Sequence, residues 1–247
     1  MSAFVKVPAD KYAEYTAFAQ AVPFGRVYPL SMTEGRQSGD IFTDGRAVLF
    51  WHYCGFAYIS GEADDAFIDE VKKLMQNGER RLVLFADEKT AGYFGEGFDI
   101  SRRLFFEYPE DKPAPALPPL PEGFDMRLMF GDIISHIEGR ITPAFSWEDP
   151  ANFISQGVGF CVTHSGKPCA WSFSAAVGGD ETDIGVETDE NFRRQGLSHA
   201  AAAMMTACVL EHGRKPVWAC HEGNKASAGL AEKLGFVKTA ECFTVHI

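Results

Sequence analysis

Hydrophobic residues recur along this chain with two periods, a helical one and an alternating one, in segments separated by turn-forming residues. Residues 64–75 give the clearest helical pattern, with an aspartate at the start, apolar side chains three and four positions apart, and an Asn-Gly stop. Runs of strand length lie on both sides of it. In the first 108 residues the pattern predicts helices over 9–21, 64–75 and 90–94, and strands within 47–60, 81–86 and 103–108.

A proline-rich stretch interrupts this pattern. Six prolines fall between Tyr108 and Pro121, and proline fixes its own φ and favours an extended residue before it. We therefore expect a stiff connector. It divides the chain into an N-terminal α+β domain (1–108), a linker (109–122) and a C-terminal domain (123–247).

The C-terminal domain is predicted to contain a mostly antiparallel sheet flanked by helices. Glycine and short polar residues at 164–167 and 178–181 join three apolar runs, as in tight hairpins. An alanine-rich helical pattern follows and ends at Gly213. The expected order is a strand over 123–129, helical segments over 133–140 and 149–155, strands over 157–163, 168–177 and 182–188, a helix over 196–212, a strand over 216–220, a helix over 225–234 and a final strand.

The junction between the strand 182–188 and the following helix carries the clearest chemical signal. The first N–H groups of a helix have no internal partner and carry the positive end of its dipole, so they can bind a phosphate. Gly196 and Ser198 leave room beside these groups, and Arg193 and Arg194 can each pair with two phosphate oxygens at once. The junction is therefore a candidate pyrophosphate site.

Two common phosphate loops are excluded, because the chain contains neither G-x-x-x-x-G-K-[ST] nor a G-x-G-x-x-G after a predicted strand. The spacing Arg193-x-x-Gly196-x-Ser198 resembles instead the [Q/R]-x-x-G-x-[G/A] motif of the GNAT (GCN5-related N-acetyltransferase) superfamily. An apolar strand, a helix that begins after Asn224 and the Leu-Gly-Phe at 234–236 resemble the later elements of that family in the same order. The resemblance covers the C-terminal domain and implies a GNAT fold there. It leaves open whether the first domain is a diverged copy of the same fold.

The resemblance also implies acetyl-CoA as cosubstrate. In this family the end of the fourth strand pairs with the pantetheine arm, and the start of the next helix binds the pyrophosphate. The residue that caps the later helix lies near the coenzyme, although here it also fits a plain N-cap. The coenzyme-binding residues implied are Val186, Thr188, Arg193, Arg194, Gln195, Gly196, Leu197, Ser198, His199, Asn224 and Ser227.

Acetyl transfer to an alkylamine requires a base, because the ammonium form dominates below about pH 10. Many family members take this base from an acid on the fourth strand, where Glu187 is the first candidate and Asp183 the second; each also fits a solvated surface carboxylate. Many relatives protonate the departing thiolate with a tyrosine, but this chain has Ala231 there. Three alternatives follow: another donor such as His221 or a water, no dedicated acid, or a loss of catalysis.

Acceptor contacts in the family come from the first helices and their loop, here residues 141–153. Phe145 and Trp147 offer an aromatic wall, and Glu148 with Asp149 offers negative charge, a combination suited to an organic cation. The two aromatic side chains also fit ordinary packing. We expect Phe145, Trp147 and Glu148 to bind substrate.

Composition restricts the classes of partner, the location and the metal sites that we expect. The formal net charge of −11 argues against a nucleic-acid partner and favours a cationic amine, although it also simply favours solubility. The chain has no apolar run of membrane-spanning length, and residues 1–6 carry no secretion signal, so we expect no membrane association and a cytoplasmic location. The six cysteines form no C-x-x-C pair, so we expect reduced thiols and no metal site.

These observations predict an N-acetyltransferase that acts on the primary amine of a small cationic molecule. A non-catalytic acyl-CoA sensor is one alternative, prompted by Ala231. A protein-modifying acetyltransferase is another. We expect the first domain to shape the acceptor cleft or to form the contact of a homodimer.

Overall fold

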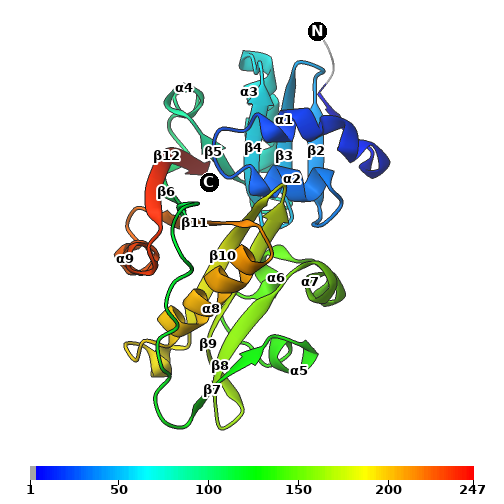
Figure 1. The fold of residues 1–247 in the computed structure, drawn as a ribbon. Helices are drawn as coiled ribbons and strands as arrows, with labels where there is room; N and C mark the ends of the chain where they lie inside the picture. Colours follow the sequence, from blue (N-terminus) through cyan, green and yellow to red (C-terminus); the bar gives the residue numbers. More distant parts are fainter. Residues whose placement is uncertain (1–3) are drawn as a thin grey trace.

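The computed structural model describes residues 4–247 and shows an elongated sheet that runs through the whole molecule (Figure 1). Residues 1–3, part of the segment in which no secretion signal is expected, lie outside the described residues. Within residues 4–247 the sheet has 12 strands in the order β1-β2-β3-β4-β5-β12-β6-β11-β10-β9-β8-β7. No helix in this range is long and apolar enough to cross a membrane.

The first half of the chain contributes six strands of the described sheet. They are β1 (Val5–Lys6), β2 (Gly39–Thr43), β3 (Ala47–His52), β4 (Phe56–Gly61), β5 (Val83–Ala86) and β6 (Asp99–Glu107). Its helical segments are a 3₁₀ helix (Ala9–Tyr15), α1 (Thr16–Gln20), α2 (Val27–Thr33), α3 (Asp65–Asn77) and α4 (Glu88–Ala91).

The second half contributes the other six strands. They are β7 (Phe124–Leu128), β8 (Gly159–His164), β9 (Lys167–Gly178), β10 (Glu181–Thr188), β11 (Lys215–His221) and β12 (Val237–His246). Its helical segments are α5 (Gly131–Ile134), α6 (Pro143–Ser146), α7 (Pro150–Gln156), a 3₁₀ helix (Glu190–Phe192), α8 (Leu197–Glu211) and α9 (Lys225–Leu234).

The two halves repeat one succession of elements. In each, a first strand leads through short helices to three antiparallel strands, and a crossover helix then leads to a fifth strand that is parallel to the fourth. β1–β5 therefore correspond to β7–β11, α3 to α8 and α4 to α9. With this correspondence the strand order reads the same from both ends of the sheet. The first half therefore repeats the topology of the second.

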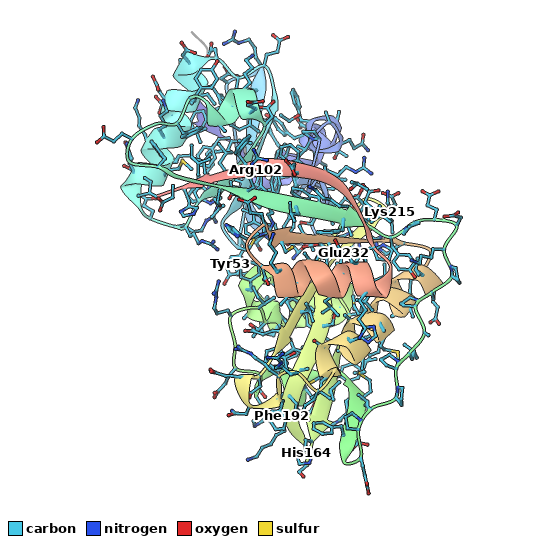
Figure 2. All side chains as sticks on the ribbon, turned by 90° about the vertical axis from the view of Figure 1, so that its left-hand side faces the viewer. Tyr53, Arg102, His164, Phe192, Lys215 and Glu232 are labelled. Carbon is cyan, nitrogen blue, oxygen red and sulfur yellow. The ribbon has the colours of Figure 1, made fainter. Side chains whose placement is uncertain are left out.

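The last strand of each half is exchanged. β6 pairs antiparallel with β11 of the second half, where Phe105 lies opposite Ala219, and β12 pairs with β5 of the first half. β6 and β12 also pair with each other, so in Figure 1 the red β12 lies between β5 and β6. Figure 2 shows Arg102 on β6 beside β12, where its guanidinium lies 2.9 Å from Glu241. The sheet is thus continuous across the expected domain division, which stays a prediction.

Helices cover both faces of the sheet. α8 lies on β8, β9 and β10, and its residues 200–203 are alanines with at most 3% of their surface exposed, which lets the helix approach closely. α3 packs on the first half through Phe67, Ile68 and Val71. α2 contacts β3 and also β9 and β10, so it joins the two halves. All six cysteines are unpaired, and five are buried.

Most predicted elements are confirmed, but some differ in extent and some were not predicted. Asp64 caps α3 by accepting the N–H of Phe67 at 3.0 Å, and Gly78 ends it with a φ of 64°. The helix expected over 9–21 is instead a 3₁₀ helix followed by the short α1, and the one expected over 133–140 is limited to α5. α2 was not predicted because every residue in it is buried, which removes the amphipathic period.

Candidate active site

β10 and β11 separate halfway along their length and open a cleft. They pair in parallel only from Glu181 opposite Lys215 to Asp183 opposite Val217. Directly after Asp183, the pairing of β10 with β9 shifts register. The cleft beyond this point has a volume of about 370 Å³ and is lined by β10, β11, the start of α9, the loop before α6, and residues of the first half. The divergence leaves the edge of β10 beyond Asp183 unpaired on the side of β11.

The start of α8 forms what we call the phosphate cradle, residues 193–199. Gly196 has a φ of 79°, and a side chain there would meet no atom within 4 Å. Within residues 4–247, no hydrogen-bond acceptor engages the backbone N–H groups of residues 195–199. Leu197 is 1% exposed and anchors the helix, whereas Arg193, Arg194 and Gln195 are exposed. The cradle is therefore open and carries free donors.

Two further candidate residues lie in the phosphate cradle and can donate hydrogen bonds through their side chains. Ser198 and His199 are half-buried in the first turn of α8. Burial, together with the nearby charge of Lys233, lowers the pKa of His199. The ring is therefore neutral near pH 7 and offers a hydrogen bond but no charge. Figure 2 labels Phe192, the residue before the cradle, at the lower end of the molecule.

The unpaired edge of β10 lies between the cradle and Asp183. Val186 lines the cleft, whereas Thr188 lies at the end of the strand, outside the cleft lining. Both residues remain paired with β9 on the other side. An extended ligand can therefore add to the free edge of β10 through backbone hydrogen bonds, as in strand addition.

Asp183 is the most perturbed carboxyl group of the cleft. It is 6% exposed, and the hydroxyl of Tyr28 on α2 donates a hydrogen bond to it at 2.6 Å. Burial raises the pKa of Asp183 to about 6, although the Tyr28 hydrogen bond and the positive charge of Arg103 act in the opposite direction. Tyr28 and Arg103 belong to the first half, so both halves build the site.

Glu187 has a different environment. It is half-buried, and its carboxylate accepts the backbone N–H of Ile141 at 2.6 Å. Gly139 also lies against it, because a Cβ at Gly139 would come within 2.5 Å of a Glu187 oxygen. This carboxylate therefore holds the 139–141 loop over the cleft.

The end of β11 and the start of α9 bring three further candidates to the cleft. His221 is exposed, and its Nδ1 accepts the N–H of Gly223 at 2.9 Å, so the neutral ring carries its proton on Nε2. Asn224 caps α9 by accepting the N–H of Ser227 at 3.1 Å. Ser227 Oγ accepts the indole N–H of Trp218 at 3.0 Å. Ala231 is fully buried, so this position supplies no polar group.

Only one of the expected acceptor residues reaches the cleft. Phe145 lines it and packs edge-on against Phe56 at 5.7 Å between ring centroids. Trp147 is 2% exposed and donates its indole N–H to the carbonyl of Ser174 at 2.8 Å, so it packs in the core and does not form the expected aromatic wall. Glu148 is exposed outside the cleft lining. Asp149, likewise outside it, caps α7.

Sequence reasoning missed the cleft residues that come from outside the expected motifs. They include four residues of the first half and one from the loop before α6, namely Tyr28, Phe56, Arg81, Arg103 and Arg140. None lies in a recognisable motif. The exchange of β6 brings Arg103 here and the packing of α2 on β9 brings Tyr28, and neither contact leaves a local signal in the sequence.

The comparisons with known proteins agree with this geometry. The family model described as GNAT acetyltransferase matches residues 29–244. The match reaches well into the first half, which corrects the expectation that the resemblance is confined to residues 123–247. A solved GCN5-related N-acetyltransferase-like protein from Streptococcus suis has the same fold, with a TM-score of 0.73 at 20% identity over 97% of this chain and 99% of that one.

Two curated relatives are similar in sequence. YdfB of Bacillus subtilis, an uncharacterized N-acetyltransferase, is 28% identical over 254 residues, which cover 96% of this chain and 91% of that protein. The [ribosomal protein bS18]-alanine N-acetyltransferase of Escherichia coli is 30% identical over 105 residues, which cover 41% of this chain and 70% of that protein.

Proposed function

The chain belongs to the GNAT acetyltransferase family, and from this premise we propose that it transfers the acetyl group of acetyl-CoA to the primary amine of a small molecule. One observation carries the proposal. The free N–H groups of the phosphate cradle and a buried carboxylate, Asp183, lie at the two ends of one unpaired strand edge. A long thioester that carries a pyrophosphate fits this arrangement, because its ends need such groups at a distance from each other.

The phosphate cradle supports the coenzyme end of the proposal. A pyrophosphate at residues 195–199 satisfies N–H groups that have no acceptor in the described chain and benefits from the dipole of α8. Arg193 and Arg194 add charge-assisted hydrogen bonds. The pantetheine arm then follows the free edge of β10 toward Asp183.

Asp183 is our proposed general base. Bound acetyl-CoA supplies an activated carbonyl carbon, to which the amine nitrogen bonds. Asp183 accepts the proton that the nitrogen loses, directly or through a water, and the carbon–sulfur bond breaks to release CoA. We favour Asp183 over Glu187 because its raised pKa makes it a stronger base, whereas the Glu187 carboxylate already binds the N–H of Ile141.

Release of the thiolate needs little help from the protein. A thiol is a far stronger acid than an aliphatic alcohol, with a pKa near 8.5 in the cysteine side chain, so a thiolate is an acceptable leaving group. The Nε2–H of His221 can donate a hydrogen bond to the sulfur, and solvent supplies the proton. This arrangement replaces the tyrosine that is absent at Ala231.

A second candidate function is acetylation of a protein N-terminus. It is favoured by the similarity to the bS18-alanine N-acetyltransferase of Escherichia coli. The two candidates differ in the acceptor alone, so one experiment distinguishes them.

We would measure thiol release from acetyl-CoA with free amines and with short peptides, and acetyl-CoA binding by calorimetry. We expect binding, and faster thiol release with at least one free amine than with any peptide. Faster turnover of a peptide would favour the second candidate. Binding without turnover of any acceptor would contradict both and leave an acyl-CoA sensor.

A further inference from the structure

Arg103 lies inside the cleft with most of its hydrogen-bonding capacity unused. A guanidinium has five N–H donors. Here one nitrogen donates to the carbonyl of Ala219 at 3.2 Å, while Nε is buried and has no partner among residues 4–247. The guanidinium lies over the rings of Phe56 at 5.0 Å and Phe85 at 5.4 Å, which fix its position. A buried donor without an acceptor is costly, so this site favours an anionic ligand.

Arg103 and Asp183 face the same cleft without touching. Both line it, yet no nitrogen of Arg103 lies within 4.0 Å of a carboxylate oxygen in residues 4–247. The positive charge still lowers the pKa of Asp183, so the two groups are close enough to interact. Two opposite charges separated by open space are complementary to a ligand that carries both charges.

The charges that line the whole cleft also favour an acceptor with a negatively charged group. Its lining contains three arginines, namely Arg81, Arg103 and Arg140, but only two carboxylates. One of these, Glu187, is already bound by a backbone N–H. The cleft thus carries an excess of positive charge, although the whole chain has a net charge of −11. A purely cationic acceptor, as the acidic composition suggests, fits this lining poorly.

A smaller cavity adjoins the pair on the side away from the phosphate cradle. It has a volume of about 120 Å³ and shares Arg103 and Asp183 with the cleft. Its other walls combine the aromatic residues Phe24, Tyr58 and Phe105 with an ion pair between Arg26 and Glu181. The aromatic part of this space suits a compact apolar or aromatic group.

We propose that the acceptor is an amino acid, with Arg103 binding its carboxylate and Asp183 receiving the proton of its α-amine. The apolar side chain of the acceptor occupies the aromatic cavity. Arg103 is thus a specificity-determining residue that β6 of the first half delivers to the site of the second. This inference rests on the proposed function and narrows its acceptor to one chemical class.

The test compares acceptors that differ in the carboxylate alone. Thiol release is measured with phenylalanine against phenethylamine, and with leucine against isopentylamine. Phenylalaninamide and the dipeptide Phe-Gly serve as acceptors whose α-carboxylate is neutralised or displaced. We expect kcat/KM to be higher by about 10- to 100-fold for each amino acid than for its amine, the effect of one charge-assisted hydrogen-bonding partner.

Arg103→Gln tests the residue itself. We expect this variant to bring the ratio of phenylalanine to phenethylamine turnover close to one. Arg102→Gln is the matched control, because Arg102 is the exposed neighbour on the same strand and pairs with Glu241; it should keep the wild-type ratio. An equal loss for both acceptors in Arg103→Gln would overturn the inference.

Two further outcomes decide the remaining cases. If Arg103→Gln does not fold, the wild-type acceptor pairs decide alone, and an advantage for the amines, the amide or the dipeptide refutes the inference. If the wild type turns over other amines but none of these acceptors, calorimetry of phenylalanine and phenethylamine in the presence of CoA decides: preferred binding of phenylalanine supports the inference, and equal binding refutes it. Failure of the wild type to bind acetyl-CoA, or to turn over any acceptor, refutes the proposed function itself.

Discussion

The surroundings of Asp183, our proposed base, set its pKa. An exposed aspartate ionises near pH 3.9 and is too weak a base to take a proton from an ammonium group at an appreciable rate. Burial raises the pKa of Asp183 to about 6, so the group is still ionised at pH 7 but is a stronger base. Tyr28, Arg103 and Glu181 are the charged or titratable groups that tune it. The hydroxyl of Tyr28 also fixes the orientation of the carboxylate.

We predict that Asp183→Asn lowers kcat by about 100- to 10,000-fold, the contribution of a general base, while acetyl-CoA affinity is unchanged. A raised pKa means that the carboxyl group is protonated, and inactive as a base, at pH values below about 6. The kcat/KM of the wild type should therefore fall as the pH drops through about 6. Stopped-time assays across pH 4 to 9, together with calorimetry, measure both effects.

Glu187→Gln is the control for this prediction. The amide oxygen of glutamine can still accept the N–H of Ile141, so the 139–141 loop should remain in place. We expect kcat to stay within about tenfold of the wild type. A larger loss in Glu187→Gln than in Asp183→Asn would transfer the role of base to Glu187.

At the scale of a single element, α8 combines two functions along its length. Its first turn exposes free N–H groups in the phosphate cradle, while residues 200–203 bury an alanine surface against the sheet. The small side chains bring the helix close to β9 and β10 and thereby set where the cradle lies relative to the cleft. Packing and binding are thus linked through the position of one rigid helix.

We predict that Gly196→Glu abolishes acetyl-CoA binding, because it places a carboxylate beside the pyrophosphate and the N–H groups of α8. The backbone there has a φ of 79°, so the substitution also introduces backbone strain. Gly213→Glu is matched to it: Gly213 follows the other end of α8, has a φ of 68° and has equally open surroundings. Calorimetry should show acetyl-CoA binding in Gly213→Glu but not in Gly196→Glu. Unchanged affinity in Gly196→Glu would refute the proposal that the phosphate cradle binds the pyrophosphate.

At the scale of the whole molecule, the exchange of β6 and β12 makes the two halves depend on each other. Each strand completes the sheet of the other half, and the two strands pair with each other over Asp99–Glu107 and Val237–His246. The linker also packs on the second half, because Lys112 donates to the carbonyl of Gly235 at 3.1 Å. Arg103 and Tyr28 are correctly placed only when both halves are assembled.

We predict that cutting the chain in the linker leaves both halves associated. A protease site in place of residues 114–118 lies in a mostly exposed stretch, so cleavage should be efficient. After cleavage the fragments should elute together in size-exclusion chromatography and still bind acetyl-CoA. The fragment 109–247 made alone lacks β6 and should aggregate, because β11 then has an unpaired edge. Separation of the cleaved halves under native conditions would contradict the exchange.

The sequence by itself determined the features that depend on neighbouring residues. Asp64 marked the start of α3, glycines marked the hairpins, and Gly196 marked the start of α8, because capping, turns and helix starts are local. The order of the second half followed from the same signals. The helix α2 was not predicted, because it is buried on all sides and lacks an amphipathic period.

Only the tertiary structure decided which distant residues share the cleft. The exchange of β6 brings Arg103 opposite His221, and the packing of α2 brings Tyr28 to Asp183, across separations of more than a hundred residues in the chain. Burial then decided that Asp183 has a raised pKa and that Trp147 lies in the core. Strand pairing and desolvation depend on where whole elements dock, and no local pattern of side chains encodes that docking.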